Sequence, residues 1–195
     1  MKPLDTVRGP ALSLPDTDVD TDIVYPARFL LITEKKGLGA YAFHDRRGEA
    51  DFPIGDGPVP PILIAGANFG CGSSREQAPW ALADLGIRLI VAESFGEIFF
   101  TNCFRNGLLP IRLDAATVDA LHAAARDDAE FEIDLRTRTL SVAGREIAFD
   151  VADDRREALL NGWDDTARIR ALHGDDIARF EAAQRRDAPW LWTKD

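Results

Sequence analysis

The stretch Ile-Leu-Ile-Ala-Gly-Ala-Asn-Phe-Gly-Cys-Gly-Ser-Ser-Arg-Glu-Gln, residues 62–77, carries most of the information about the fold and function of this chain. It begins with an apolar run, 62–65, that is typical of a buried strand, and continues into a loop with three glycines. The loop leads to Ser73, Ser74 and Arg75 at the expected start of a helix. Backbone amides at a helix start attract anions, and an arginine strengthens that tendency. The stretch therefore predicts a site for a carboxylate or phosphate, with a hydroxyl placed for proton transfer.

Common glycine-loop signatures do not fit this stretch. A P-loop has a glycine, four further residues and then Gly-Lys-Ser/Thr. Counted from Gly66, the second glycine would stand at position 71, which is Cys71, and no lysine follows it. The dinucleotide fingerprint requires glycine at Arg75, and a hydrolase nucleophile elbow requires glycine at Glu76. Helix capping remains an alternative, because the two serines stand three residues before Glu76 and Gln77, the spacing of a capping box. Capping accounts for one serine but not for both serines, the arginine and the glycines together.

Length and composition indicate one soluble domain. The chain has 195 residues, of which 46% are hydrophobic, and a formal net charge of −10. This acidic balance argues against a nucleic-acid partner and against an anionic membrane surface. No apolar run is long enough to span a bilayer, and the N-terminal residues lack the apolar segment of a signal peptide. We therefore expect a cytoplasmic protein.

The sequence predicts no metal site within this chain. Cys71 and Cys103 are too few for a disulfide framework or an iron–sulfur cluster, and they do not form a Cys-x-x-Cys pair. Alternating aspartates in residues 16–22 suggest calcium, but an EF-hand loop would require glycine and glutamate where Ile23 and Phe29 stand. We expect residues 16–22 to form a polar loop stabilised by Asx turns.

Hydrophobic periodicity predicts an α/β class, with a mixed sheet and flanking helices. Strands are expected at 62–65, 88–92, 108–113, 130–135, 139–142 and 146–149, the last two joined by a turn at 143–144. Helices are expected from the glycine loop to about 85, and at 94–105, 114–126, 153–161 and 175–186. Ser94 and Asp114 are expected to cap helices, and Pro110 is expected to interrupt the strand at 108–113. Residues 23–25 are expected to be strand-like. We expect one domain, 1–195, with an irregular N-terminal region (1–60), a core (61–150) and a helical extension (151–195).

Five separated blocks of this sequence resemble one enzyme family. They are Asp18-Val19-Asp20-Thr21-Asp22-Ile23, Gly37-Leu38-Gly39, the run from Asn68 to Glu76, Ser94-Phe95-Gly96-Glu97-Ile98-Phe99 and Gly107-Leu108-Leu109-Pro110. Together they resemble the small subunits of 3-isopropylmalate dehydratases, the swivelling β/β/α domain of the aconitase superfamily. The resemblance implies that fold. It also implies a hydro-lyase that isomerises 2-isopropylmalate to 3-isopropylmalate, by dehydration and rehydration, in leucine biosynthesis.

The resemblance implies roles for residues of the glycine loop. Ser73 matches the superfamily's serine base, which removes a proton next to a carboxylate. Arg75 matches the arginine that binds a substrate carboxylate, and Ser74 and Gly72 would help to hold the same group. The resemblance also implies a separate large subunit with a [4Fe–4S] cluster, whose open iron acts as Lewis acid on the departing hydroxyl. This chain would then be inactive without that subunit.

Other positions have less definite roles. The block Asp20, Thr21 and Asp22 is expected to shape the site without contacting the substrate. Gln77 stands where the family usually has histidine. For two arginines, the sequence does not decide between contact with the substrate and a solvated charge. For three leucines, it does not decide between an apolar wall of the site and core packing. These are Arg46, Arg47, Leu30, Leu31 and Leu38.

Three alternative functions remain open from the sequence. One is the small subunit of a related hydratase acting on maleate or citraconate. A second is a non-catalytic binding protein with the same fold. A third, a stand-alone serine hydrolase, lacks a histidine and aspartate that the sequence places near Ser73. Trp190 and Trp192 in a charged tail suggest docking, onto this domain or onto a partner.

Overall fold

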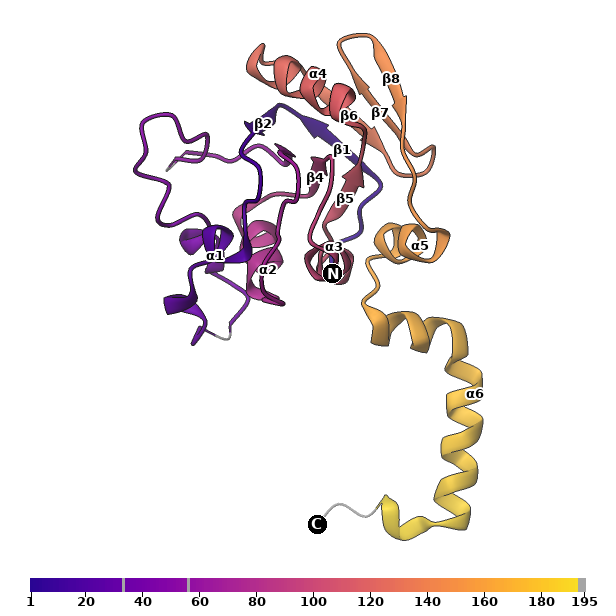
Figure 1. Ribbon diagram of the computed structural model, residues 1–195. Coiled ribbons are helices and arrows are strands. Elements are labelled where there is room, and N and C mark those ends of the chain that lie inside the picture. Colours follow the sequence, from indigo (N-terminus) through magenta and orange to yellow (C-terminus); the bar gives the residue numbers. More distant parts are fainter. Residues whose placement is uncertain (33, 56, 193–195) are drawn as a thin grey trace. The chain divides into compact units, whose positions relative to one another are not determined.

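The computed structural model describes residues 1–32, 34–55 and 57–192. The chain forms two units, Met1–Gly162 and Trp163–Asp195, and all the strands belong to the first (Figure 1). Within the described residues, no helix is both long and apolar enough to cross a membrane. The α/β class expected from the sequence is confirmed, with the strands divided between two sheets.

The first sheet is parallel and carries the glycine loop. Its strands, in spatial order, are β2 (Ala11–Leu14), β3 (Ile62–Ala65), β4 (Leu89–Ala92) and β5 (Leu109–Arg112). The helices α2 (Gln77–Leu85) and α3 (Glu97–Arg105) connect β3 to β4 and β4 to β5. Pro110 lies inside β5 without interrupting it, because β5 is an edge strand that needs fewer backbone donors.

The second sheet is antiparallel. Its strands, in spatial order, are β1 (Thr6–Gly9), β6 (Phe131–Asp134), β7 (Thr139–Val142) and β8 (Arg145–Ala148). The predicted turn between β7 and β8 is confirmed. Ala143 and Gly144 both have positive φ, 48° and 75°, as a tight two-residue hairpin turn requires.

The N-terminal region is more regular than its sequence predicts. Residues 6–14, expected to be irregular, form β1 and β2. The run 23–25, expected to be strand-like, is instead the end of the helical turn α1 (Thr21–Val24) and its C-cap, Tyr25. Asp20 caps α1, since its Oδ1 accepts a hydrogen bond from the Ile23 N–H at 2.7 Å. Two 3₁₀ turns follow, η1 (Ala27–Phe29) and η2 (Leu38–Tyr41).

Helices α4 and α5 agree with the prediction, whereas two capping boxes suggested by the sequence do not form. Asp114 caps α4 (Ala115–Arg126), since its Oδ1 accepts from the Thr117 N–H at 2.9 Å. Helix α5 (Asp153–Asn161) ends at Gly162 in the left-handed conformation. The capping box considered as an alternative at residues 73–77 does not form, and the one expected at 94–97 is wrong, because neither α2 nor α3 has a side-chain cap.

Alternate residues of the parallel sheet face two hydrophobic cores. Leu63 and Ile90 pack with α2, α3 and the N-terminal turns. Ile62 and Ile64 pack with α4 and the antiparallel sheet. Both faces are thus buried, as the apolar composition of β3 and β4 requires. The loops after β2, β3 and β4 are left at the carboxyl edge of the sheet, where open α/β sheets bind ligands.

The second unit is a long helix with a short tail. Helix α6 (Asp165–Asp187) starts earlier than the predicted 175–186, because Asp164 caps it by accepting from the Ala167 N–H at 2.7 Å. A non-helical residue, His173, kinks it. The 3₁₀ turn η3 (Pro189–Leu191) follows, and the Arg185 guanidinium lies 4.3 Å from the centre of the Trp192 ring.

Candidate active site

Two segments that are far apart in the sequence run side by side at the carboxyl edge of the parallel sheet. One is residues 18–21, after β2, and the other is 67–71 in the glycine loop. They are joined by hydrogen bonds from Asp18 N to Ala67 O (2.9 Å), Gly70 N to Val19 O (2.7 Å) and Thr21 N to Cys71 O (3.0 Å). The structure therefore places the Asp20–Asp22 block directly against the glycine loop.

The loop after β4 supports the same arrangement. Ser94 Oγ accepts a hydrogen bond from the Asn68 N–H at 2.8 Å, and Ser94 O accepts from the Phe69 N–H at 3.1 Å. The Asn68 side chain in turn donates to Asp18 Oδ1 at 2.8 Å. These roles could not be predicted from the sequence, because Ser94 has the spacing of a helix cap but contacts another loop. Asn68 has φ of 57°, a conformation in which asparagine is enriched.

Ser73 presents its hydroxyl to solvent beside a buried threonine. Its side chain is exposed, whereas Thr21 is only 1% exposed. Ser73 Oγ lies 3.0 Å from Thr21 Oγ1, and the Ser73 N–H donates to Thr21 Oγ1 at 3.3 Å. Gly72 has φ of 90°, and its left-handed turn brings Ser73 over α1. The serine is thus accessible to a ligand and held in position.

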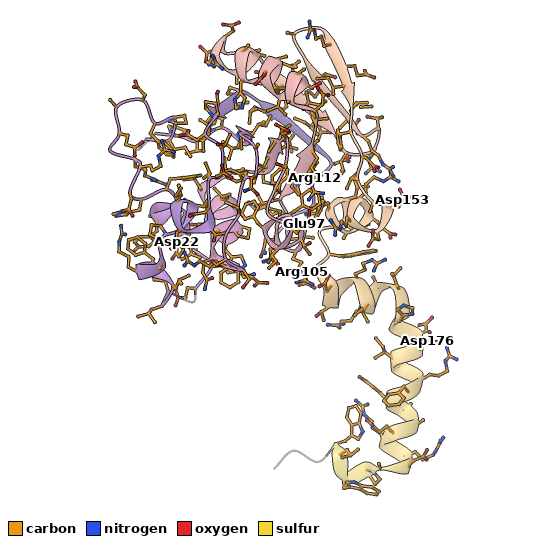
Figure 2. The ribbon with its side chains drawn as sticks, in the orientation of Figure 1. Asp22, Glu97, Arg105, Arg112, Asp153 and Asp176 are labelled. Atoms are coloured by element: carbon orange, nitrogen blue, oxygen red, sulfur yellow. The ribbon has the colours of Figure 1, made fainter. Side chains whose placement is uncertain are left out.

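Arg75 and Asp22 form an ion pair beside Ser74. The Arg75 side chain is 18% exposed, and Asp22, which Figure 2 shows on the segment that carries α1, is 53% exposed. A guanidinium has five N–H donors, so one ion pair leaves capacity for another carboxylate. Ser74 is exposed, and Gln77 is half-buried as the first residue of α2. The arrangement can bind an anion next to the Ser73 hydroxyl.

The two cysteines do not fit an iron–sulfur cluster held by this chain. Cys103 is completely buried in the core, and this burial raises the pKa of its thiol well above the usual value. Cys71 is half-buried, and its pKa is raised by burial and by the charges of Asp20 and Asp18. Clusters bind thiolates, which both environments disfavour. Among the described residues, no three His, Cys, Asp or Glu side chains gather as a metal site.

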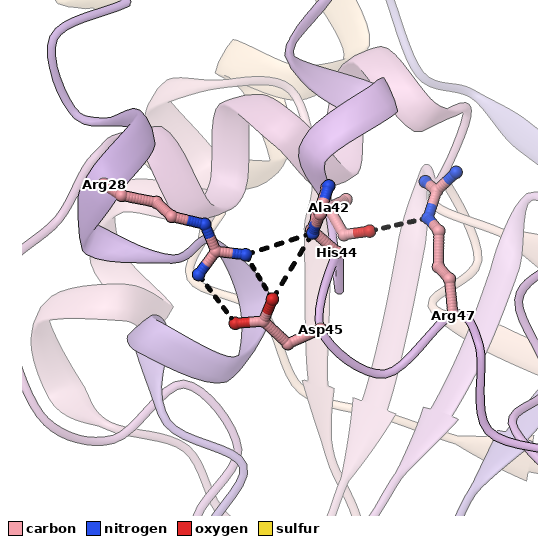
Figure 3. A network of polar contacts seen from close by, with 5 residues as sticks. All are labelled: Arg28, Ala42, His44, Asp45 and Arg47. Carbon is pink, nitrogen blue, oxygen red and sulfur yellow. Dashed lines mark hydrogen bonds and ion pairs between the residues drawn. The ribbon is translucent and has the colours of Figure 1, made fainter.

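The paired arginines Arg46 and Arg47 have structural contacts. Arg47 donates to the carbonyl oxygens of Ala42 (2.8 Å, Figure 3) and Gly39 (2.6 Å). Arg46 forms ion pairs with carboxylates of residues 16 and 49, at 3.2 and 2.9 Å, and its side chain is 24% exposed. The structure therefore gives both arginines acceptors within the chain.

A network that the sequence analysis missed joins η1 to the segment after η2 (Figure 3). Arg28 donates to His44 Nδ1 at 3.1 Å and to Asp45 Oδ2 at 2.9 Å. The hydrogen bond from Arg28 lowers the pKa of the Asp45 carboxyl to about 2. The partners are separated by 16 and 17 positions, and η2 lies between them, so no helix or strand period could indicate their contact.

Helix α2 holds the loop before η2. Asp84 Oδ2 accepts from the Gly37 N–H at 3.0 Å and from the Gly39 N–H at 2.8 Å. Leu38, considered for an apolar wall, is completely buried in the core beside this loop. Leu30 is half-buried, whereas Leu31 is 93% exposed and available for contact with a ligand or a protein.

Family models match both ends of the chain. The aconitase C-terminal domain matches residues 1–116, which include the whole glycine loop and the segment 18–22. The C-terminal domain of the 3-isopropylmalate dehydratase small subunit matches residues 172–192, in the second unit.

Curated relatives match over nearly the full length. A 3-isopropylmalate dehydratase small subunit of Rhodospirillum centenum is 44% identical, covering 97% of this chain and 98% of the relative. That of Teredinibacter turnerae is 41% identical, covering 98% of both. A 3-isopropylmalate dehydratase of Rhizopus niveus is 40% identical over 95% of this chain but only 26% of its own length. The crystal structure of 3-isopropylmalate dehydratase from Methanocaldococcus jannaschii has a TM-score of 0.70 at 26% identity, covering 89% of this chain and 99% of that one.

Proposed function

The chain belongs to the family of 3-isopropylmalate dehydratase small subunits, and from this premise we propose how its own residues take part in the reaction. It acts as the small subunit of a hydro-lyase that interconverts 2-isopropylmalate and 3-isopropylmalate, by loss and return of water, in leucine biosynthesis. The observation that carries this function is the identity to small subunits of that name over almost the entire chain.

Ser73 is the base in this proposal. Dehydration requires removal of a proton from the carbon next to a carboxylate, which needs a basic atom that the substrate can reach. Ser73 is exposed, and its Oγ is held at 3.0 Å from Thr21 Oγ1. A serine hydroxyl is a weak base unless its alkoxide is stabilised, so neighbouring donors decide whether it can act.

Arg75 binds the substrate carboxylate in this proposal. Negative charge spreads onto that carboxylate as the proton leaves, and a planar guanidinium can stabilise this charge by donating paired hydrogen bonds to the carboxylate. Asp22 holds Arg75 in place through the ion pair, and Asp20 fixes α1 by capping it. The Ser74 hydroxyl and the Gly72 backbone amide would bind the same carboxylate. The exposed Leu31 offers an apolar contact for the isopropyl group.

We further propose that the iron–sulfur cluster lies on a large subunit and that this chain alone has no turnover. The relatives are named small subunits, and the cysteines of this chain are unsuited to a cluster. In the Rhizopus niveus relative, the matching region is about a quarter of a longer chain, which is consistent with a partner that can also be covalently joined. The reaction would take place in the cytoplasm.

Reconstitution of the chain with its cognate large subunit tests this function. Under anaerobic conditions, absorbance of the alkene intermediate would follow 2-isopropylmalate, 3-isopropylmalate, maleate and citraconate in parallel. We expect isopropylmalate turnover to fall by about 100-fold or more in Ser73→Ala, and KM to rise in Arg75→Lys. Ser141→Ala, a serine in β7, is the matched control and should be unaffected.

Each contrary outcome points to a different error. Full activity of Ser73→Ala would reject the serine as base. Turnover of only maleate or citraconate would support the mechanism but would mean that the chain is the small subunit of a related hydratase. Turnover by the purified chain without a large subunit would contradict the assignment of the cluster to the partner.

A further inference from the structure

The buried hydroxyl of Thr21 is directed at a single residue. Thr21 is one of three buried polar residues in the described part of the chain, and buried hydroxyls need hydrogen-bond partners. The hydrogen bonds of Thr21 Oγ1 all involve Ser73: its Oγ at 3.0 Å, its carbonyl oxygen at 3.3 Å and its N–H at 3.3 Å. Two of these contacts hold the Ser73 backbone, and the third joins the two hydroxyls directly.

The donor and acceptor count shows what this hydroxyl can do. A threonine hydroxyl has one proton and two lone pairs, and the Ser73 N–H occupies one of those lone pairs. While Ser73 is protonated, either hydroxyl can donate to the other. The Thr21 proton has two possible acceptors, the Ser73 carbonyl oxygen and Ser73 Oγ. Once Ser73 Oγ has lost its proton, it can only accept, and its negative charge makes it the stronger of these two acceptors for the Thr21 proton. This hydrogen bond then becomes charge-assisted and stronger than a neutral one.

The backbone of Thr21 is fixed independently of the substrate. Its N–H donates to Cys71 O at 3.0 Å, and its carbonyl oxygen accepts from the Tyr25 N–H at 2.9 Å. The cap of α1 by Asp20 fixes the preceding residue. A donor that is already oriented needs no reorganisation when charge develops, which is what makes such donors effective in catalysis.

We propose that Thr21 is a positioning residue that stabilises the deprotonated Ser73 by donating its hydroxyl proton to Ser73 Oγ. This inference rests on the proposed role of Ser73 as base. Ser73 first loses its proton to bulk water. The alkoxide then takes the substrate proton and becomes a hydroxyl again, while the Thr21 proton stays on Thr21 throughout. Thr21 therefore acts through Ser73 and does not contact the substrate.

Three substitutions in the complex with the large subunit test this proposal. Thr21→Val removes the hydroxyl at nearly constant shape, Thr21→Ala removes it without a replacement methyl group, and Thr21→Ser keeps it. We expect Thr21→Val and Thr21→Ala to lower kcat roughly 10- to 100-fold, the loss of one charge-assisted hydrogen bond, with little change in KM. The acid limb of the plot of kcat against pH should move to higher pH by about one unit or more. A tenfold weaker stabilisation of the Ser73 alkoxide corresponds to a rise of about one unit in the pKa of Ser73. Thr21→Ser should retain activity.

The outcomes separate this inference from the proposed function. Wild-type kcat and pH profile in Thr21→Val would overturn it, and so would an equal loss in Thr21→Ser, because side-chain shape would then be responsible. If Thr21→Val does not fold, the comparison of Thr21→Ala with Thr21→Ser decides. The control is Thr139→Val on the antiparallel sheet, where the hydroxyl bonds to Thr137 at 2.7 Å, and it should leave kcat unchanged. Activity of Ser73→Ala would instead reject the base itself.

Discussion

Replacement of Gly70 by alanine tests whether the glycine loop is packed as tightly as the structure indicates. Gly70 has φ of 71°, and a Cβ added there would lie 2.2 and 2.4 Å from two ring carbons of Phe99. The Phe99 side chain is 1% exposed and packs edge-on against Phe69, with 5.4 Å between ring centres. The ring therefore has little room to move away from a new methyl group.

The expected loss of stability has two components. A left-handed backbone conformation costs a non-glycine residue roughly 1–2 kcal/mol. Overpacking of a buried ring costs typically about 1–3 kcal/mol more. The free energy of unfolding should therefore fall by about 2–5 kcal/mol, a large share of the roughly 5–15 kcal/mol that stabilises an ordinary domain.

Urea unfolding, followed by circular dichroism, measures this change. We expect a lower midpoint with an unchanged slope, because the exposed surface on unfolding stays the same. Gly37→Ala is the matched control: Gly37 has φ of 90°, but a Cβ there meets no heavy atom within 4 Å. It should lose only the conformational component, about 1–2 kcal/mol.

Two results would refute this reasoning. One is an equal loss in Gly70→Ala and Gly37→Ala, which would mean that the Phe99 ring offers no obstacle. The other is strict additivity of Gly70→Ala with Phe99→Leu. If the clash is real, a smaller side chain should relieve some of it, and contacting residues should couple.

Further predictions concern pH, capping and thiol reactivity. Burial lowers the pKa of His122, so below about pH 6.5 the unfolded chain takes up a proton that the folded chain resists. The free energy of unfolding should therefore decrease from about pH 7 to about pH 5.5, and a pH titration of His122→Asn should show a smaller decrease. Asp114→Ala removes the cap of α4, so the free energy of unfolding measured in urea should fall by about 1 kcal/mol. Asp119→Ala, at an exposed position of the same helix, should lower it by less. Alkylation of the native chain, read by mass spectrometry, should modify Cys71 slowly and Cys103 only after unfolding; early labelling of Cys103 would contradict its burial.

Local sequence patterns were sufficient to predict most of the helices and strands after residue 62. The apolar run of β3, the aspartate before α4 and the glycine after α5 act through neighbours within a few positions, so their consequences can be read directly. The strands β1 and β2 could not be predicted in this way. They pair with β6 and β3, whose sequences lie far along the chain, and Pro10 separates two runs of only four residues.

The amino-acid sequence by itself determined the side chains of the candidate site: a glycine loop that ends in Ser73, Ser74 and Arg75, and too few cysteines for a cluster. Only the tertiary structure decided which groups act on these side chains. Thr21 lies 3.0 Å from Ser73 although 52 positions separate them. That contact depends on the parallel pairing of β2 with β3, which brings the loops after both strands to one edge of the sheet. A spacing rule cannot show such a contact, because the distance is set by sheet pairing and not by the helix or strand period.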